Sequence, residues 1–376
     1  MNSTDNIPSP AHPTDSGTGR KLPDMTGAPM PAPPSRHRRA TLFIGLGILA
    51  VLAIGAAMTA PYLLTGTASA AVIKIPRQAT SANVCDTLSK YFGPDFAGRA
   101  TKAFSQLVKN PAERYGAYDI PEGTSPVKAA RILARGSQTQ LTLTINGVRE
   151  FLPFADRIAA KFDFSGDDLR KALSDPELMK RYGLTTEQAP SLFLNDSYYL
   201  YWTDSPRALI EKVGANYNRV WNAARRAKAE SLGLSPAQIM TIASIVDEES
   251  NQISEKGRIG RLYINRLNAG MRLQADPTVR FALKDFTIKR IAGSHLQAPG
   301  PYNTYRVAGL PPGPIRTTSV ATIDAILDSS PSDDLYMCAR EDFSGFHNFA
   351  SDYETHMANA RRYQQALDRL GIQQQP

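Results

Sequence analysis

One uncharged segment constrains this chain more than any other feature. No charged residue occurs between Ala40 and Ile73, and residues 42–64 are almost wholly apolar. A helix rises about 1.5 Å per residue, so this core can cross a hydrocarbon layer of roughly 30 Å, in which a helix satisfies its own backbone groups. The sequence therefore predicts a transmembrane helix over residues 40–64.

The residues around this segment predict its orientation. The basic run Arg36–Arg39 lies directly ahead of it, and basic flanks remain in the cytoplasm. We therefore expect residues 1–39 inside and residues 65–376 outside. The alternative is a cleaved signal peptide, because residues 68–70 (Ala-Ser-Ala) resemble a cleavage site. The apolar core exceeds the roughly 7–15 residues usual in such peptides, which favours an uncleaved anchor.

The composition separates a tail from a globular remainder. Residues 1–35 are rich in Pro, Ser, Thr, Gly and Asp, so a disordered cytoplasmic tail is predicted over residues 1–39. The chain is 42% hydrophobic and 21% charged, as in globular proteins. Its formal net charge of +8 suits an anionic partner, but without a basic stripe nucleic-acid binding is not expected. Cys85 and Cys338, the only cysteines, are expected to be single thiols.

Alternating strand and helix patterns follow the apolar segment. Strand patterns cover residues 71–75, 118–120 and 139–145, and helical patterns begin at Ser81, with Val84, Leu88 and Tyr91 on one face, and at Val127, ending at Gly136. These patterns predict a small α+β subdomain over residues 72–150. The alternative is a spacer that lifts the rest of the chain off the membrane.

Residues 151–235 carry mostly helical patterns and are predicted to connect this subdomain to the next. A run of aromatic residues, Tyr198, Tyr199, Tyr201 and Trp202, interrupts them. Aromatic residues at this density are typical of a hydrophobic core, although one or two beside a cleft could stack on the face of a sugar.

The helix predicted from Ser235-Pro236 onward carries the strongest candidate chemistry. Serine is a favoured cap and proline is favoured in the first turn. Three acids, Asp247, Glu248 and Glu249, end this helix. At about 100° per residue they point in different directions, and only Glu249 falls at the border of the apolar face, between the isoleucines at positions 242 and 245.

This placement predicts an unusual carboxyl group. A carboxyl beside aliphatic groups is partly desolvated, which raises its pKa. A glutamic acid that is protonated near neutral pH can act as a general acid. The alternative is that the three acids form a solvated surface patch.

The segments after this helix predict the walls of a site. A second amphipathic helix with apolar positions from 259 to 267 stops at Gly270, and Asp276-Pro277 is interpreted as the cap and first turn of another helix. Stiff loops follow at residues 302–305 and 309–313. Their hydroxyl and amide groups suit a hydroxyl-rich ligand. The five histidines lack metal-ligand spacing, so neither a metal nor another cofactor is expected.

The motifs together resemble one family. The helix 243–250 (ASIVDEES) resembles the signature helix of the YceG-like family, the endolytic murein transglycosylases also called MltG. The further matching segments are 265–267, 271–278, 301–305, 309–315, the strand at Tyr336 and 345–349. The similarity runs from about Ile73 to the C-terminus. The Asp-Glu-Glu-Ser form of the motif and Trp221-Asn222 resemble members from Bacteroidetes-like bacteria.

The resemblance implies an α+β enzyme at a bacterial inner membrane. Its expected order is the transmembrane helix, a LysM-like α+β subdomain over residues 72–150 and a YceG-like catalytic domain over residues 236–376. It would cut peptidoglycan glycan strands internally, between N-acetylmuramic acid and N-acetylglucosamine. The product would be a 1,6-anhydro-muramic end made without water, so the enzyme would be a lyase. Family membership also suggests cooperation with peptidoglycan synthases, as a terminator of glycan chains.

The resemblance assigns the catalytic role to Glu249. The change of the motif's first Glu to Asp247 tells against position 247 as the catalyst. Glu249 would protonate the glycosidic oxygen and then accept the proton of the muramic C6 hydroxyl as it attacks C1. The residues predicted to hold the glycan are Gln274, Asp276, Tyr302, Asn303 and Thr304.

Three alternatives stay open at this point. Asp276 could be only a helix cap. The enzyme could be a lysozyme-type hydrolase with Asp247 or Asp276 as its second carboxylate. The chain could also be a non-catalytic wall-binding scaffold, which needs the fold but not Glu249.

Overall fold

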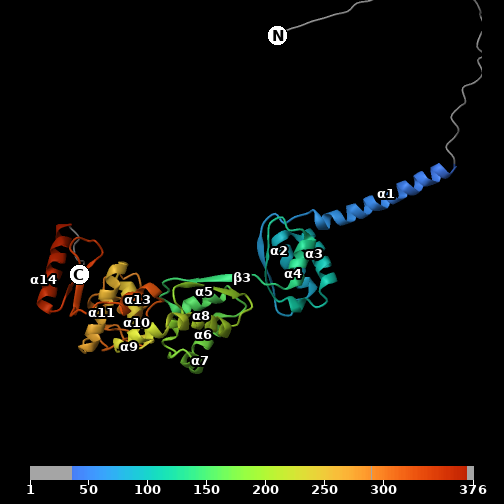
Figure 1. The fold of residues 1–376 in the computed structure, drawn as a ribbon. Helices are drawn as coiled ribbons and strands as arrows, with labels where there is room; N and C mark the ends of the chain where they lie inside the picture. Colours follow the sequence, from blue (N-terminus) through green and yellow to red (C-terminus); the bar gives the residue numbers. More distant parts are fainter. Residues whose placement is uncertain (1–35, 289, 371–376) are drawn as a thin grey trace, which may run out of the picture. The chain divides into compact units, whose positions relative to one another are not determined.

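The computed structural model describes residues 36–288 and 290–370, and the chain divides into two compact units, Met1–Pro61 and Tyr62–Pro376. The disorder predicted for residues 1–35 lies outside the described residues. Figure 1 shows the elements in chain order. Each unit is described by itself.

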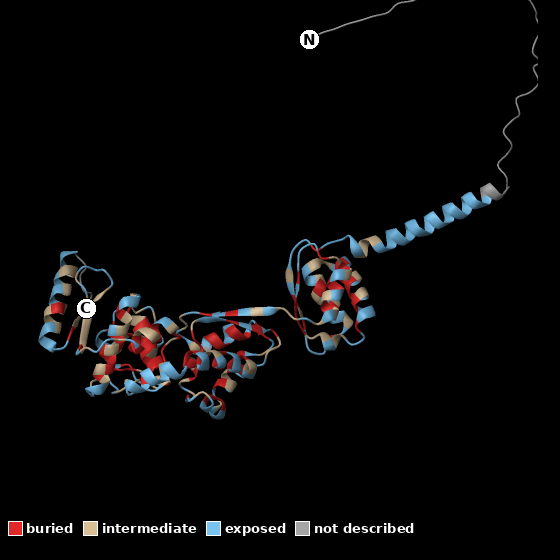
Figure 2. Cartoon of the chain, viewed as in Figure 1, coloured by how far each residue is buried: buried red, intermediate tan, exposed pale blue. Residues whose placement is uncertain are grey.

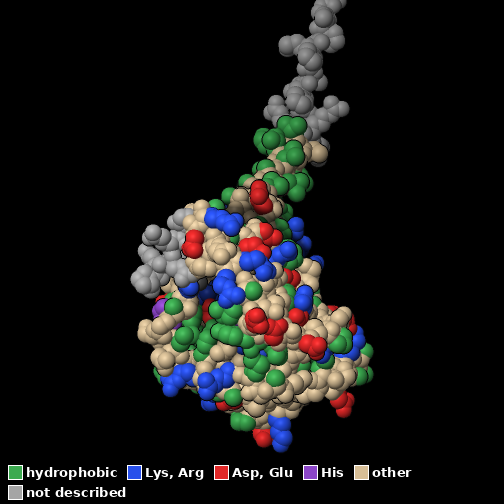
Figure 3. All heavy atoms as spheres, turned by 90° about the vertical axis from the view of Figure 1, so that its left-hand side faces the viewer, with side chains coloured by type: hydrophobic (Ala, Val, Ile, Leu, Met, Phe, Trp, Pro, Cys, Tyr) green, Lys and Arg blue, Asp and Glu red, His purple; other side chains and the backbone are tan. Residues whose placement is uncertain are grey.

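Helix α1, Arg36–Leu63, supplies the described part of the first unit. It includes the basic residues 36–39 as well as the apolar segment that was predicted to cross the membrane. Among the described residues, Ala40–Leu63 is the one helix long and apolar enough to cross a membrane. Residues 40–59 of this helix are exposed (Figure 2), and hydrophobic groups cover much of its surface in Figure 3. The predicted apolar helix is confirmed, and it is a candidate single-pass anchor.

The second unit opens with a small hydrophobic core of its own, built from residues 73–133. Strands β1 and β2 pair antiparallel, with Ala71 opposite Ile120 and Ile75 opposite Gly116. The elements are β1 (Ala71–Ile75), α2 (Ser81–Phe92), α3 (Pro94–Leu107), the 3-10 turn η1 (Pro111–Arg114), β2 (Gly116–Ile120) and α4 (Pro126–Arg135). The strands and helices predicted here are present.

One residue of this core was placed wrongly from the sequence. Val84 and Leu88 of α2 are buried, but Tyr91 is 45% exposed. Helix α2 ends at Phe92, whose ring packs against Phe96 at 5.2 Å between ring centroids. Phe92, the next residue, is partly buried against this core, whereas Tyr91 remains outside.

A second and larger hydrophobic core begins at strand β3, and its first elements precede residue 235. Strand β3 pairs with β4 rather than with β1 or β2, so Leu143 and Ile145 belong to this core. The elements are β3 (Gln140–Ile145), α5 (Phe151–Ala159), α6 (Gly166–Leu173), α7 (Pro176–Lys180), η2 (Ala189–Leu192), β4 (Asp196–Tyr201), α8 (Pro206–Val220) and α9 (Ala223–Ser231).

Three of the four aromatic residues in this run lie on β4, a strand that was not predicted from the sequence, and Trp202 follows it directly. Tyr198 and Trp202 are buried, whereas Tyr199 and Tyr201 are 56% and 39% exposed. This alternation is the two-residue period of a strand, which the dense aromatic content concealed. The run therefore contributes both to the core and to the surface.

Helix α10 lies at the centre of the remaining elements and packs against α9, α11, α12 and α13. Its residues from Ile239 to Asp247 are buried without interruption. The elements are α10 (Pro236–Glu249), α11 (Ile253–Asn268), α12 (Asp276–Leu283), η3 (Gly293–Gln297), α13 (Val320–Leu327), the antiparallel strands β5 (Tyr336–Ala339) and β6 (His347–Ala350), and α14 (Tyr353–Arg369).

Two glycines allow α11 and α13 to approach closely. A Cβ atom at Gly257 would lie 2.5 Å from the carbonyl oxygen of Ala325, and one at Gly260 would lie 2.6 Å from Cγ1 of Ile326. Glycine at these positions is required by the helix contact, since the obstacle at Gly257 is backbone. This contact fixes α11, which supplies part of the site described below.

We predict that Gly257→Ala destabilises the protein by about 1–3 kcal/mol, because the added methyl group forces α11 and α13 apart. The matched control is Gly98→Ala on α3, where nothing lies within 4 Å of the added Cβ. The control should stabilise by roughly 0.5–1 kcal/mol through helix propensity. Thermal unfolding of the detergent-solubilised chain measures both, and equal shifts for the two variants would contradict the close-contact explanation.

Candidate active site

Glu249 is the last helical residue of α10. The helix begins as predicted, with the Ser235 side chain accepting from the backbone of Gln238 and with Pro236 in the first turn. Ile242 and Ile245 are fully buried and Glu249 is half-buried. The predicted position of Glu249 at the border of the buried face is confirmed.

Glu249 lines a cavity of about 300 Å³. Its walls come from α10, α11, α12, β5, β6 and the loops between them. The lining residues are Glu249, Leu262, Tyr263, Arg266, Leu273, Gln274, Asp276, Tyr305, Met337, Cys338, Ala339 and His347. Polar groups from segments far apart in the sequence therefore meet around one carboxyl group.

The environment of Glu249 raises its pKa to about 7, chiefly because burial removes water from the carboxylate. The nearby charge of Asp276 raises this pKa further, whereas the Tyr263 hydroxyl, which donates to Glu249 Oε1 at 2.7 Å, lowers it. Burial also raises the pKa of Tyr263 well above its usual range, so this hydroxyl remains a donor. Glu249 can thus hold or release a proton near neutral pH.

Asp276 lies in the same cavity and is not a helix cap. The cap of α12 is Ala275, and no side chain closes this end of the helix. The carboxylate of Asp276 instead accepts a hydrogen bond from the Tyr305 hydroxyl at 2.6 Å. Asp276-Pro277 therefore occupies the first turn, and the interpretation of Asp276 as the cap is wrong.

Gln274 is held in an uncommon backbone conformation at the cavity wall. Its φ is +51°, in the left-handed region that few non-glycine residues adopt. Its N–H donates to the carbonyl of Thr304, and its Oε1 accepts from Arg266 Nη1 at 3.3 Å. Arg266 also donates to the carbonyl of Leu273. This conformation is fixed by partners on two other segments.

The other three predicted glycan-binding residues lie away from Glu249. Tyr302 lines a different cavity, of about 220 Å³, and its ring packs on Phe281 at 4.6 Å. Asn303 is fully buried and donates to the carbonyls of Leu296 and Ala298. Thr304 is 1% exposed and accepts from the N–H of Ala275. The structure thus brings Gln274 and Asp276 to Glu249, whereas Asn303 and Thr304 hold the loop in place.

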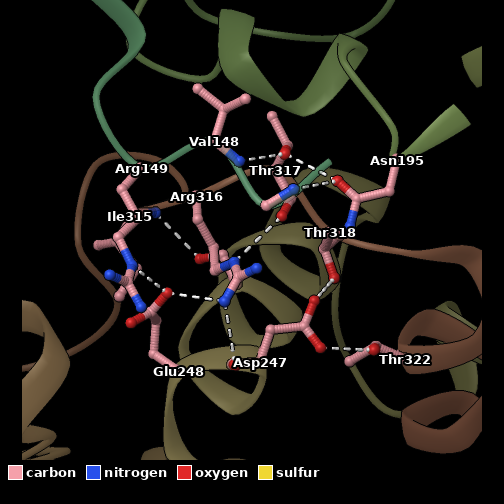
Figure 4. Close-up of polar contacts among 12 residues, drawn as sticks. Val148, Arg149, Asn195, Asp247, Glu248, Ile315, Arg316, Thr317, Thr318 and Thr322 are labelled. Atoms are coloured by element: carbon pink, nitrogen blue, oxygen red, sulfur yellow. Dashed lines mark hydrogen bonds and ion pairs between the residues drawn. The ribbon is translucent and has the colours of Figure 1, made fainter. Parts of the chain in front are cut away.

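The two acids before Glu249 are each engaged by protein partners (Figure 4). Glu248 accepts from Arg149 Nε and Arg316 Nη1, both at 2.7 Å. Asp247, 8% exposed, accepts from the hydroxyls of Thr318 and Thr322 at 2.6 Å each. It also pairs with Lys256 of α11. The alternative of a solvated acidic patch is therefore wrong.

Further contacts join the end of α10 to the loop at residues 316–318 and, through it, to residues next to strands β3 and β4. Arg316 Nη1 donates to the carbonyl of Asp247 as well as to Glu248. Thr317 donates to Asn195 Oδ1, and the N–H of Val148 donates to Thr317. The end of α10, and with it Glu249, is thereby fixed from the β3 and β4 sides.

Sequence reasoning missed three contributors to the site: Tyr263, Arg266 and His347. Tyr263 was assigned only to the apolar face of a helix. A signal for its role was present, because a buried tyrosine hydroxyl usually needs a hydrogen-bond partner. The partner itself could not be identified, since it depends on how α10 and α11 pack.

The described residues offer neither a cluster of metal ligands nor a disulfide. Within residues 36–288 and 290–370, no group of three or more His, Cys, Asp or Glu side chains could hold a metal ion. Cys85 and Cys338 are free, partly buried thiols, as predicted.

The fold and the cavity together define an α+β protein with one desolvated carboxyl group placed for acid–base chemistry. A model of the YceG-like family matches residues 73–362. The chain belongs to the YceG-like family, and the predicted resemblance is confirmed.

Individual relatives agree with this family. An endolytic murein transglycosylase of Bacillus subtilis (strain 168) is 36% identical over 110 residues, which are 28% of this chain and 29% of that protein. Another endolytic murein transglycosylase, from Streptococcus pneumoniae serotype 2, is 28% identical over 138 residues, 36% of this chain and 25% of that protein. The matches thus span less than a third of each relative's length.

A solved structure shares the fold. A YceG-like protein from Listeria monocytogenes superposes with a TM-score of 0.52 at 25% identity, covering 77% of this chain and 98% of that chain. The predicted α+β fold class is confirmed by this likeness. The relation to Bacteroidetes-like members stays a prediction.

We predict that Glu249→Gln stabilises the protein above neutral pH. A folded-state pKa of about 7 against an ordinary 4.5 means that the wild-type protein loses stability as pH rises between these values. The gain of the variant should therefore be absent below pH of about 4.5, grow to pH 7 and then level off at up to about 3 kcal/mol.

Thermal unfolding across pH measures this gain. The control is Glu248→Gln, which weakens the acceptor of two arginines and should lower stability at neutral pH. A Glu249→Gln variant whose unfolding temperature follows the wild type at every pH would contradict the desolvation of Glu249.

Proposed function

We propose that this protein is an endolytic murein transglycosylase, a lyase that cuts peptidoglycan glycan strands between N-acetylmuramic acid and N-acetylglucosamine. One observation carries the proposal: the carboxyl group of Glu249, with a pKa of about 7, lines a cavity rich in hydrogen-bonding groups. The names of the similar proteins from Bacillus and Streptococcus support this reaction class.

In the proposed mechanism, Glu249 acts first as an acid and then as a base. It donates its proton to the glycosidic oxygen as the bond from C1 to that oxygen breaks. The C6 hydroxyl of the same muramic residue attacks C1 and gives its proton back to Glu249. The product carries a 1,6-anhydro ring, no water is consumed, and the carboxyl group is regenerated for another cycle.

Tyr263 and Asp276 tune this carboxyl group. The Tyr263 hydrogen bond stabilises the carboxylate that exists between the two proton transfers. The charge of Asp276 opposes that carboxylate and keeps Glu249 protonated at the start. Because the two influences have opposite signs, the pKa of Glu249 stays near the pH at which it must both donate and accept.

A hydrolase of the lysozyme type is the second candidate, because Asp276 supplies another carboxylate in the cavity. Asp247 is less suited to that role, since a lysine and two threonines already occupy its oxygens. In the transglycosylase proposal Asp276 and Gln274 bind sugar groups. Tyr302 would contribute from the separate cavity that it lines, and Asn303 and Thr304 would act by shaping the loop.

The proposal extends to the position of the enzyme in the cell. We infer a single-pass protein of the inner membrane, with the basic residues before α1 in the cytoplasm and the second unit outside. The separate core of residues 73–133 supports the assignment of a LysM-like subdomain. Cooperation with peptidoglycan synthases as a chain terminator is part of the same proposal, because an anchored enzyme meets nascent strands at the membrane surface.

The first test uses Glu249→Gln, which should lower the yield of anhydro-muropeptides from purified sacculi by at least about 100-fold, the usual range for a lost acid–base group. Glu230→Gln, the same change at an exposed position of α9, is the matched control and should keep full activity. Undiminished cleavage by Glu249→Gln would favour a non-catalytic role for this residue and sink the mechanism.

Mass spectrometry of the same digests separates the two reaction classes. The lyase gives muramic ends lighter by one water than reducing ends. A digest that contains only reducing ends would replace the transglycosylase with a hydrolase.

The pH profile of activity provides a second prediction: two substitutions should shift it in opposite directions. Activity requires protonated Glu249, so kcat/KM should fall above pH of about 7. Tyr263→Phe removes a stabiliser of the carboxylate and should move this fall to higher pH. Asp276→Asn removes an opposing charge and should move it to lower pH. Shifts in the same direction would show that neither residue acts on Glu249 as described.

A further inference from the structure

A buried glutamate and a histidine form a second pair at the wall of the cavity. Glu255 of α11 is 8% exposed, and its Oε1 accepts from the backbone N–H of His347 at 2.8 Å. Its Oε2 lies 3.1 Å from Nδ1 of the same histidine. One carboxylate thus holds both the backbone and the ring of one residue, which fixes the orientation of the imidazole.

His347 lines the cavity that contains Glu249, although Glu255 does not. His347 begins β6, and three residues of the paired strand β5, Met337, Cys338 and Ala339, line the same cavity. The β5–β6 hairpin is therefore one wall of the site. The sequence motif around His347 is not used by the mechanism proposed above.

Helix α11 holds this hairpin firmly. Arg258 forms two hydrogen bonds with the carboxylate of Asp334, at 2.7 and 3.0 Å. Arg266 donates from Nε to the carbonyl of Leu335 at 2.6 Å. The hairpin does not depend on His347 alone for its position, so the His347 side chain is available to contact a ligand in the cavity.

The hydrogen bonds around the cavity show which ring nitrogen of His347 is available to a ligand. Tyr263 and Tyr305 each donate their one hydroxyl hydrogen to a carboxylate of the site. A carboxylate only accepts, so Nδ1 of His347 carries the hydrogen that faces Glu255. Nε2 is therefore the ring nitrogen of His347 that is left for a ligand.

We propose that His347 is a substrate-positioning residue: its Nε2, oriented by Glu255, forms a hydrogen bond with a sugar hydroxyl of the glycan bound beside Glu249. The inference rests on the proposed function and names how one wall of the same site recognises a hydroxyl-rich strand. A hydroxyl held at this wall orients the sugar ring relative to the carboxyl group of Glu249. A merely structural histidine would instead serve only to satisfy Glu255.

Two isosteric variants separate these roles. In His347→Gln the side-chain amide reaches the position of Nε2 and can still meet the ligand. In His347→Asn the amide takes the place of Nδ1, preserves the contact to Glu255 and leaves the position of Nε2 empty. Each variant is made in the full chain carrying Glu249→Gln, so that glycan stays intact, and calorimetry measures the binding of uncrosslinked glycan strands freed of peptides.

We expect His347→Asn to weaken binding about tenfold, the effect of one lost hydrogen bond. His347→Gln should bind within about threefold of its parent. Equal binding by both variants, equal loss in both, or the reverse order would overturn the proposal. The reverse order is the result expected if His347 only anchors the hairpin.

A second measurement covers the possibility that a variant fails to fold. Nitrogen-15 labelling of the histidine rings in the parent chain reports Nε2 directly, with the His347 ring assigned through correlations to its own backbone. Its resonance should shift when glycan binds, and an unchanged resonance under saturating glycan would overturn the proposal.

The outcome for His347 is distinguishable from the outcome for the proposed function. If the wild-type chain fails to cut glycan, the proposed function fails. If the wild-type chain cuts glycan, Glu249→Gln does not, and the His347 variants bind like their parent, only the role of His347 is lost.

Discussion

The desolvation of one carboxyl group at the end of α10 is the constraint on which the site depends. Glu249 extends from a helix whose preceding residues are buried, and the loss of water raises its pKa to about 7. A carboxylate removed from water costs free energy, so the surrounding structure must hold Glu249 in this position. The packing of α10 among four other helices supplies that restraint.

Three consecutive acids acquire three different tasks from this packing. Asp247 points into a buried set of hydroxyl groups and a lysine, and so joins α10 to α11 and α13. Glu248 joins the same helix to Arg149 and Arg316. Only Glu249 meets the cavity. Successive residues of a helix differ in direction by about 100°, and the neighbours that each direction encounters decide its chemistry.

The cavity is assembled from pieces that are distant in sequence. Tyr263 comes from α11, Asp276 from α12 and His347 from the β5–β6 hairpin. Each is held by a partner outside the cavity or across it, as Asp276 is held by Tyr305. Such second contacts keep the reacting groups in place without help from the substrate, which reduces the loss of freedom on binding. The proposed anchor also favours binding, because it keeps the enzyme near new glycan at a high local concentration.

The sequence by itself determined the apolar helix and the strands and helices with strong periodicity, because these depend on residues a few positions apart, whose spacing is fixed by backbone geometry. The resemblance of several motifs to one family indicated the family and the candidate role of Glu249. The strand β4 escaped because its aromatic residues on both faces hid the alternation. Only the tertiary structure decided that Asp276 is no cap, that Asn303 and Thr304 are buried, and that Tyr263 meets Glu249. Contacts of this kind join segments through packing, and no local pattern contains the information that brings them together.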